Sequence, residues 1–167
     1  MPSKVLILMG SDSDMPAMEP AVKMLKRFEV PFEITVSSAH RSPERTRWLL
    51  SEAEQQGVQV IIGAAGGAAH LPGVLAAETI LPVIGVPLDS SPLKGMDALL
   101  AIVQMPPGIP VATMAVGAWG ATNAALLAVQ ILALKDPDLR EALIAYKREM
   151  AEGVERKAEK LKLSLES

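Results

Sequence analysis

Short apolar segments alternate with longer amphipathic segments along most of this chain of 167 residues. Val5–Met9 and Val58–Ile62 are almost continuously apolar, which is typical of strands that are covered on both faces of a parallel sheet. Phe32–Val36 alternates apolar and polar residues, which predicts a strand nearer the sheet edge. The repeated order of strand and helix predicts an α/β fold built from βαβ units.

We expect a single α/β domain, residues 1–167, with three α/β/α layers, a five-stranded parallel flavodoxin-like sheet and a long C-terminal helix. The expected strands cover residues 4–9, 32–37, 58–63, 83–87 and 111–116. The expected helices cover residues 14–28, 43–56, 71–80, 95–103, 121–134 and, outside the core of residues 1–135, 137–165. Ser42 is expected to cap the second helix ahead of Pro43, and Gly57 to end it.

Composition excludes several classes of protein. The chain has no cysteine, which excludes disulfides and thiolate metal sites and fits a reducing cytoplasm. Its 16 basic and 19 acidic residues are interspersed and give a net charge of −3, so we expect no nucleic-acid partner. The residues before the first strand leave no room for a signal peptide. The uncharged stretch between Asp97 and Lys135 is interrupted by Pro106–Pro110 and later glycines, so we expect no membrane-spanning helix.

Two helices indicate contacts with other subunits. Residues 121–134 are apolar nearly all round, which predicts a helix that packs on another subunit as well as on its own sheet. Residues 137–165 are rich in charge and carry one apolar stripe, which predicts an exposed helix that docks on a neighbour. We therefore expect an obligate homo-oligomer.

The candidate site lies in the loops that follow the first three strands. These loops are Gly10–Asp14, Ser37–Pro43 and Gly63–His70. Ligands of open α/β sheets bind outside the carboxyl ends of the strands, so we expect the three loops to line one crevice.

Each loop admits a functional and a structural interpretation. Gly10–Asp14 suits a phosphate and ribose cradle, or a simple helix cap. His40 and Arg41 place a proton-transfer group beside an anion clamp, which favours catalysis or ligand binding over a plain surface loop. The glycines of Gly63–Gly73 allow either close approach of a ligand or close packing of helix on sheet, and no dinucleotide fingerprint is present.

The remaining candidates are weaker. His70 taken alone is as consistent with a structural as with a catalytic histidine. Two histidines without further ligands do not make a zinc site, so we expect no metal. Asp89–Ser91 and Gln104–Gly108 could close the crevice but are more typical of turns, and Trp48 and Trp119 are more typical of packing or interface residues.

Five segments, read together, resemble a known family, the class I N5-carboxyaminoimidazole ribonucleotide mutases of purine synthesis. The similarity covers nearly the whole chain. The segments are Met9–Asp14, Ser38–Pro43, Gly66–Gly73, Ile102–Pro106 and Asn123–Leu127.

The resemblance implies a reaction without a cofactor, in which a carboxylate moves from the exocyclic nitrogen of an aminoimidazole ribonucleotide to ring carbon C4. It implies catalysis by His40, which would transfer protons, together with His70. It also implies an octamer with sites near subunit contacts. The substrate-binding residues that it implies are Gly10, Ser11, Asp12, Asp14, Ser38, Ala39, Arg41, Ala65, Gly66, Gly67, Ala68 and Leu71. Among these, Ser11, Ser38 and Arg41 would hold the phosphate, Asp14 the ribose hydroxyls, and residues 65–71 the base and CO2.

Three positions depart from the pattern of the family. They are Gly63–Ala65, Leu88–Asp89, which adds a carboxylate near the site, and Trp119. None of the departures removes a residue with an implied role. Two alternatives remain: direct carboxylation of aminoimidazole ribonucleotide with free CO2, and a phosphosugar-binding module without catalysis.

Overall fold

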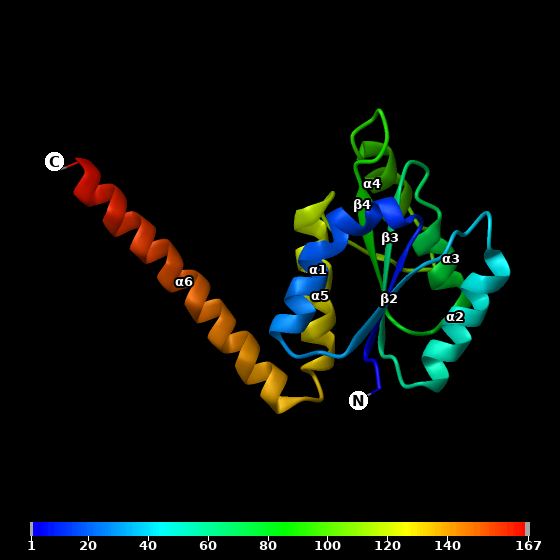
Figure 1. The fold of residues 1–167 in the computed structure, drawn as a ribbon, viewed down its shortest axis with the longest axis horizontal. Coiled ribbons are helices and arrows are strands. Elements are labelled where there is room, and N and C mark those ends of the chain that lie inside the picture. Colours follow the sequence, from blue (N-terminus) through cyan, green and yellow to red (C-terminus); the bar gives the residue numbers. More distant parts are fainter. Residues whose placement is uncertain (1, 166–167) are drawn as a thin grey trace. The chain divides into compact units, whose positions relative to one another are not determined.

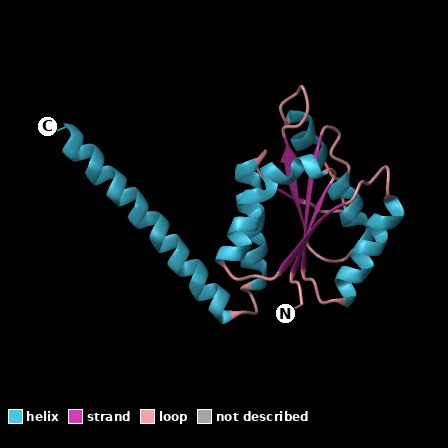
Figure 2. Cartoon of the chain, in the orientation of Figure 1, coloured by secondary structure: helices cyan, strands magenta, loops and turns pink. Residues whose placement is uncertain are grey.

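The computed structural model describes residues 2–165 and contains a five-stranded parallel sheet (Figures 1 and 2). The strand order is β2-β1-β3-β4-β5, with β2 at one edge as its alternating sequence predicted. The strands are β1 (Val5–Met9), β2 (Phe32–Val36), β3 (Val60–Gly66), β4 (Val83–Leu88) and β5 (Ala112–Thr113).

Helices cover both faces of this sheet, which confirms the predicted layers (Figure 1). Helices α1 and α5 lie on one face, and α2, α3 and α4 pack on the other (Figure 1). The helices are α1 (Met15–Arg27), α2 (Pro43–Gln55), α3 (Leu71–Glu78), α4 (Met96–Val103), α5 (Ala118–Leu132) and α6 (Pro137–Leu165), and a single 3-10 turn, η1 (Asp12–Asp14), precedes α1.

The core is built from small and medium aliphatic side chains. All five residues of β1 are at most 4 % exposed, as expected for a central strand covered on both faces. Leu6 and Leu8 belong to the cluster beneath α2, α3 and α4. On α5, Ala121, Ala125 and Val129 are fully buried, and alanine lets this helix lie close to its neighbours.

The register of the sheet brings the carboxyl ends of four strands to one edge. Met9 at the end of β1 pairs with Val36 on one side and with Ala64 on the other. Gly66 at the end of β3 pairs with Leu88 at the end of β4. The loops that follow these strands therefore start from neighbouring points, as the sequence predicted.

Two strands, β3 and β5, differ most from their predicted bounds. β3 continues to Gly66, three residues beyond the expected end at residue 63, because Ala64, Ala65 and Gly66 remain paired with β4. β5 comprises Ala112–Thr113 instead of residues 111–116. β5 lies beside the end of β4 that contains Pro87, and proline has no N–H to donate. Beyond Thr113 the contact continues through isolated backbone bonds, such as the one from the Met114 N–H to the Gly85 carbonyl.

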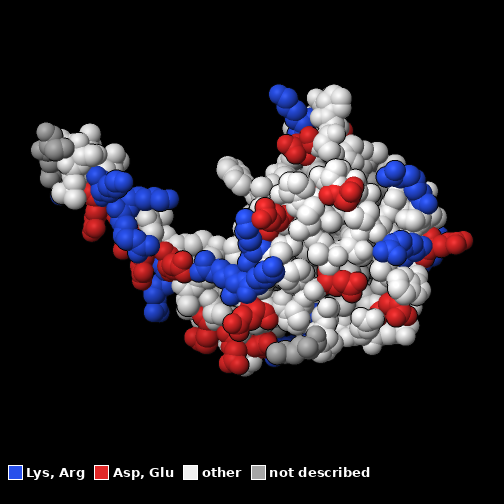
Figure 3. All heavy atoms as spheres, viewed as in Figure 1, with Lys and Arg blue, Asp and Glu red and all other residues white. Residues whose placement is uncertain are grey.

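The chain divides into two compact units, Met1–Ile131 and Leu132–Ser167. The second unit is dominated by α6, a helix of 29 residues none of which is buried within this chain. Basic and acidic side chains are interspersed on the face shown in Figure 3, including along α6. Within residues 2–165, no helix combines the length and the apolar character needed to span a membrane.

Candidate active site

A pocket of about 280 Å³ lies at the carboxyl edge of the sheet, where the sequence predicted the crevice. The loops after β1, β2, β3 and β4 all contribute to it. Its lining consists of Gly10, Ser11, Ser13, Asp14, Ser38, Ala39, His40, Arg41, Ala65, Gly66, Ala68, Ala69, His70, Leu71 and Ser90.

The loop after β1 is held by a capping box. The Ser11 hydroxyl accepts from the Ser13 N–H, and the Asp14 carboxylate accepts from the Ser11 N–H at 3.1 Å. Asp12 accepts from the Ser13 N–H and from the Ser11 hydroxyl. The capping interpretation of Gly10–Asp14 is therefore correct for the turn η1, whereas α1 itself has no side-chain cap, and Ser11, Ser13 and Asp14 also line the pocket.

Asp14 is a carboxylate in a poorly hydrated position, with 9 % of its surface exposed. Burial raises the pKa of Asp14 above its ordinary value, and the negative charge of Asp12 acts in the same direction. The hydrogen bond from the Ser11 backbone N–H opposes this shift. Asp14 thus presents an acceptor to the pocket at some cost in stability.

The loop after β2 is fixed by hydroxyl groups. Ser42 lies at the start of α2 as predicted, but its hydroxyl does not cap the helix. The hydroxyl accepts from the Ser38 N–H and donates to the Ser38 carbonyl, which closes the turn that carries His40 and Arg41. This turn leaves the Ser38 hydroxyl to accept from the backbone and side-chain N–H groups of Arg41, so its own proton is free to be donated to a ligand.

A buried threonine extends this network into the core. The Thr46 hydroxyl is fully buried, donates to the Ser42 carbonyl and lies 2.8 Å from the Ser37 hydroxyl. Because Thr46 has one hydroxyl proton, the Ser37 hydroxyl must be the donor between them. The chain of bonds links the end of β2, the loop and α2.

His40 and His70 meet at the mouth of the pocket. Nε2 of His40 lies 2.5 Å from Nδ1 of His70, and the rings are nearly perpendicular, at 86°. A hydrogen bond between them requires that one of these two nitrogens carries a hydrogen and that the other is bare. Ala69, directly before His70, has a left-handed backbone with φ of 46°, which turns the histidine toward the pocket.

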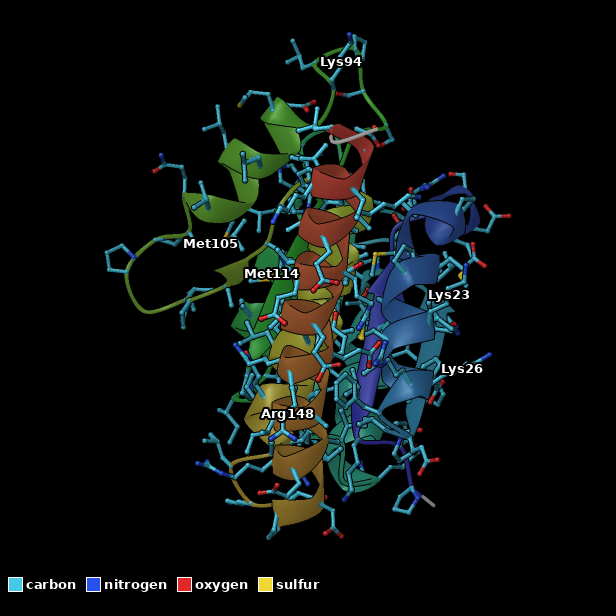
Figure 4. The ribbon with its side chains drawn as sticks, turned by 90° about the vertical axis from the view of Figure 1, so that its left-hand side faces the viewer. Lys23, Lys26, Lys94, Met105, Met114 and Arg148 are labelled. Atoms are coloured by element: carbon cyan, nitrogen blue, oxygen red, sulfur yellow. The ribbon has the colours of Figure 1, made fainter. Side chains whose placement is uncertain are left out.

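The glycines of residues 63–73 serve different purposes. A Cβ at Gly63 would lie 2.8 Å from the Leu75 side chain, and one at Gly73 would lie 2.7 Å from the sulfur of Met105, which is labelled beyond α4 in Figure 4. These two glycines therefore permit close packing of α3. Gly66 lines the pocket, and Gly67 adopts a positive φ of 59° in the turn that follows.

Most of the predicted site residues are brought together here. His40, His70 and ten of the twelve predicted binding residues line the pocket, whereas Asp12 and Gly67 lie outside its lining. Ser13, Ala69 and Ser90 line the pocket but are not among the twelve predicted binding residues, and Ser90 lies in the segment Asp89–Ser91 that was considered more typical of a turn. Ser90 stands two residues beyond β4, a signal that could have found it, while the exposed Asp89 beside it is not part of the lining. Among the described residues, no group of three carboxylate or histidine side chains is placed to hold a metal ion.

Comparison with known proteins places this pocket in a family. The profile of the family described as AIR carboxylase matches residues 4–153. The chain belongs to the AIR carboxylase family. Every lining residue of the pocket lies within the segment that matches this family.

Relatives similar to this chain carry two different names. The N5-carboxyaminoimidazole ribonucleotide mutase of Pyrococcus horikoshii is 56% identical over 155 residues, which are 93% of this chain and 86% of that protein. The phosphoribosylaminoimidazole carboxylase of Candida glabrata is 52% identical over 155 residues, 93% of this chain but 27% of that protein. The solved structure of Treponema denticola PurE superimposes with a TM-score of 0.86 at 31% identity, covering 95% of this chain and 98% of that one.

Proposed function

We propose that this chain is an isomerase of de novo purine (IMP) biosynthesis. It converts N5-carboxyaminoimidazole ribonucleotide to 4-carboxy-5-aminoimidazole ribonucleotide. The observation that carries the proposal is the pair His40 and His70, which meet over a pocket lined by hydroxyls, a cation and small residues. The chain is also 56% identical to the N5-carboxyaminoimidazole ribonucleotide mutase of Pyrococcus horikoshii.

The reaction needs transfer of a proton and confinement of the released CO2. In the first half, the carbamate C–N bond breaks, CO2 is released and a proton from His40 reaches the exocyclic nitrogen. In the second half, C4 attacks CO2, and His40 takes the proton that leaves C4. The imidazole ends in the protonation state in which it began, so the cycle balances without an outside acid or base.

The His70 ring supports this use of His40. The hydrogen bond of 2.5 Å between the two rings orients the His40 imidazole, which moves the substrate proton. Ala65, Ala68 and Leu71 line the same part of the pocket and leave a small apolar space. Such a space keeps released CO2 next to C4, where recapture competes with escape.

The polar side of the pocket suits the ribose phosphate. Arg41 makes no ion pair with any described residue, so its charge is available to a phosphate. The Ser38 hydroxyl has a proton to donate, and Ser11 stands at the start of the α1 segment. Asp14 supplies an acceptor for ribose hydroxyls.

A second candidate function is direct carboxylation of aminoimidazole ribonucleotide with free CO2. The name of the Candida glabrata relative, 52% identical over the matched residues, favours this candidate. The two reactions share C4 attack on CO2 and differ in whether CO2 comes from the carbamate.

A proton NMR time course separates these possibilities. N5-carboxyaminoimidazole ribonucleotide is incubated in CO2-depleted buffer with the wild-type protein or with His40→Asn. Conversion to the C4-carboxylated isomer by the wild type alone supports the mutase. If both samples show only the spontaneous loss of CO2, the mutase is contradicted. Turnover of aminoimidazole ribonucleotide with bicarbonate would then support the carboxylase. Binding of the nucleotide without turnover would support a phosphosugar-binding module.

We further propose that the protein works in the cytoplasm as a single-domain homo-octamer without a cofactor, in which α5 and α6 contact neighbouring subunits. Trp119 and Leu134 on or beside α5 are 82% and 81% exposed in the isolated chain, and α6 buries no residue within it. Exposed apolar groups of this size favour a partner surface. Sedimentation that gives a stable monomer would contradict the octamer.

A further inference from the structure

Ser90 is a pocket residue whose hydroxyl has no role within the fold. It follows β4 and lines the pocket from the side of His70. Among residues 2–165 its hydroxyl takes part in no hydrogen bond. The neighbouring Ser91 differs, since its hydroxyl accepts from the Leu93 N–H and contacts Asp97. Ser91 therefore holds the loop that ends near Lys94 (Figure 4), and Ser90 is left for another task.

The Ser90 hydroxyl is directed over Gly66. A Cβ at residue 66 would lie 1.8 Å from Oγ of Ser90, so the hydroxyl occupies the space that a side chain at this position would fill. The Gly66 carbonyl accepts from the Ala69 N–H at 3.0 Å, in the turn that leads into His70. Gly66 thus places the Ser90 hydroxyl beside the segment that carries His70.

Polar groups are scarce on this side of the pocket. Of the lining residues from the end of β3 and from the segments after β3 and β4, His70 and Ser90 alone have side chains able to form hydrogen bonds; the others are Ala65, Gly66, Ala68, Ala69 and Leu71. A carboxylate that enters such a region loses water and needs donors in return. His70 uses Nδ1 in its contact with His40, whereas the Ser90 hydroxyl has no partner among the described residues and is available as a donor.

We propose that the Ser90 hydroxyl donates a hydrogen bond to the carboxylate that is moved from nitrogen to C4, which makes Ser90 a substrate-binding residue. This inference rests on the proposed function. It assigns Ser90 to the carboxylate and leaves the phosphate to the loops after β1 and β2.

Binding of two nucleotides tests the assignment. 4-Carboxy-5-aminoimidazole ribonucleotide contains the carboxylate, and 5-aminoimidazole ribonucleotide lacks it but is otherwise the same. Calorimetry should show that Ser90→Ala weakens the first about tenfold, in line with loss of a hydrogen bond to a charged group, and leaves the second within about twofold. Equal losses for both nucleotides, or no loss for either, would overturn the role of Ser90.

Ser91→Ala is the matched control, because it alters the same loop without removing a group that lines the pocket. We expect it to leave the ratio of the two affinities unchanged. If Ser91→Ala changes that ratio as much as Ser90→Ala does, the shape of the loop is responsible and the proposal fails. A wild-type protein that binds neither nucleotide would refute the proposed function itself, an outcome distinct from binding that is insensitive to Ser90.

Gly66→Ala provides an independent variant. The new Cβ would displace the Ser90 hydroxyl, so this variant should lose affinity for the carboxylated nucleotide selectively. In the Ser90→Ala background the same change should alter the affinity ratio by less than about twofold, because the displaced group is already absent. Additive effects of the two substitutions on that ratio would contradict the coupling.

Discussion

The loops after β1 and β2 are held by hydrogen bonds between their own polar groups, whereas the segments after β3 and β4 are held by close packing of small residues. On the first side, Ser38, Ser42 and Thr46 form a continuous network. On the second side, Gly63 and Gly73 leave no room for a Cβ against Leu75 and Met105.

This difference predicts how each side responds to substitution. A polar side chain at the pocket surface can be changed without creating a cavity or a clash, so its loss should appear in binding or turnover. A methyl group added to a close-packed glycine has to displace its neighbours, so its effect should appear in the free energy of unfolding. The two sides are therefore expected to separate activity from stability.

The largest effect is expected from His40→Asn. His40 is exposed, and among the described residues its side chain hydrogen-bonds to His70. The variant should therefore unfold at the same temperature as the wild type. Its turnover number should fall by about 10²–10⁴, the usual contribution of a general acid–base group. Steady-state kinetics and calorimetry on the same preparation measure both quantities. Retained turnover would mean that another group moves the proton.

Gly63→Ala tests the packed side. Its Cβ would lie 2.8 Å from the Leu75 side chain and 3.3 Å from Cα of Pro72, and the second contact is backbone that cannot rotate away. We expect a loss of about 1–3 kcal/mol in the free energy of unfolding, measured with urea. Gly153→Ala in α6 is the control, because its Cβ would meet nothing nearer than 3.7 Å and alanine favours a helix. A stabilising Gly63→Ala would show that α3 has room to move.

Thr46→Val tests whether the hydroxyl network matters beyond stability. The change keeps the shape of the side chain but leaves the Ser37 hydroxyl buried without its acceptor, at a cost of about 1–2 kcal/mol in unfolding free energy. We also expect KM to rise several-fold, because the turn that carries Arg41 loses one of its two bonds from Thr46, the one donated by the hydroxyl to the Ser42 carbonyl. Thr46→Ser retains the hydroxyl and should restore KM. An unchanged KM in Thr46→Val would confine the network to a structural role.

The two sides also differed in how far they could be predicted from sequence. The polar loops were recognisable because Ser, Asp, His and Arg follow apolar strands, and all but Ser13 of their lining residues were predicted. The packed side was harder, because a run of Gly and Ala is compatible with a loop or a strand. Whether Gly63 approaches a ligand or a helix depends on Leu75 and Pro72, which only the folded chain brings beside it. Ser90 was ranked as a turn residue for the same reason, since its position in the pocket depends on the space above Gly66.

The smallest expected effect concerns Asp14, a mostly buried carboxylate on the polar side of the pocket. Burial raises the pKa of Asp14 above its ordinary value of 3.8, so the folded state binds the proton more tightly than the unfolded state does. The stability that this proton contributes is fully present below the ordinary value and is lost as the pH rises through the raised pKa.

Asp14→Asn removes this titration while keeping an oxygen that can accept from the Ser11 N–H. The variant should therefore gain stability relative to the wild type as the pH rises from about 3.5 to 7, with urea midpoints at each pH as the measurement. The opposite trend would mean that the bond from Ser11 outweighs burial. A change at Asp14 would then affect the free energy of unfolding, as a change at a packed glycine does. The contrast between the two sides would hold for Ser38 and Arg41 but not for Asp14.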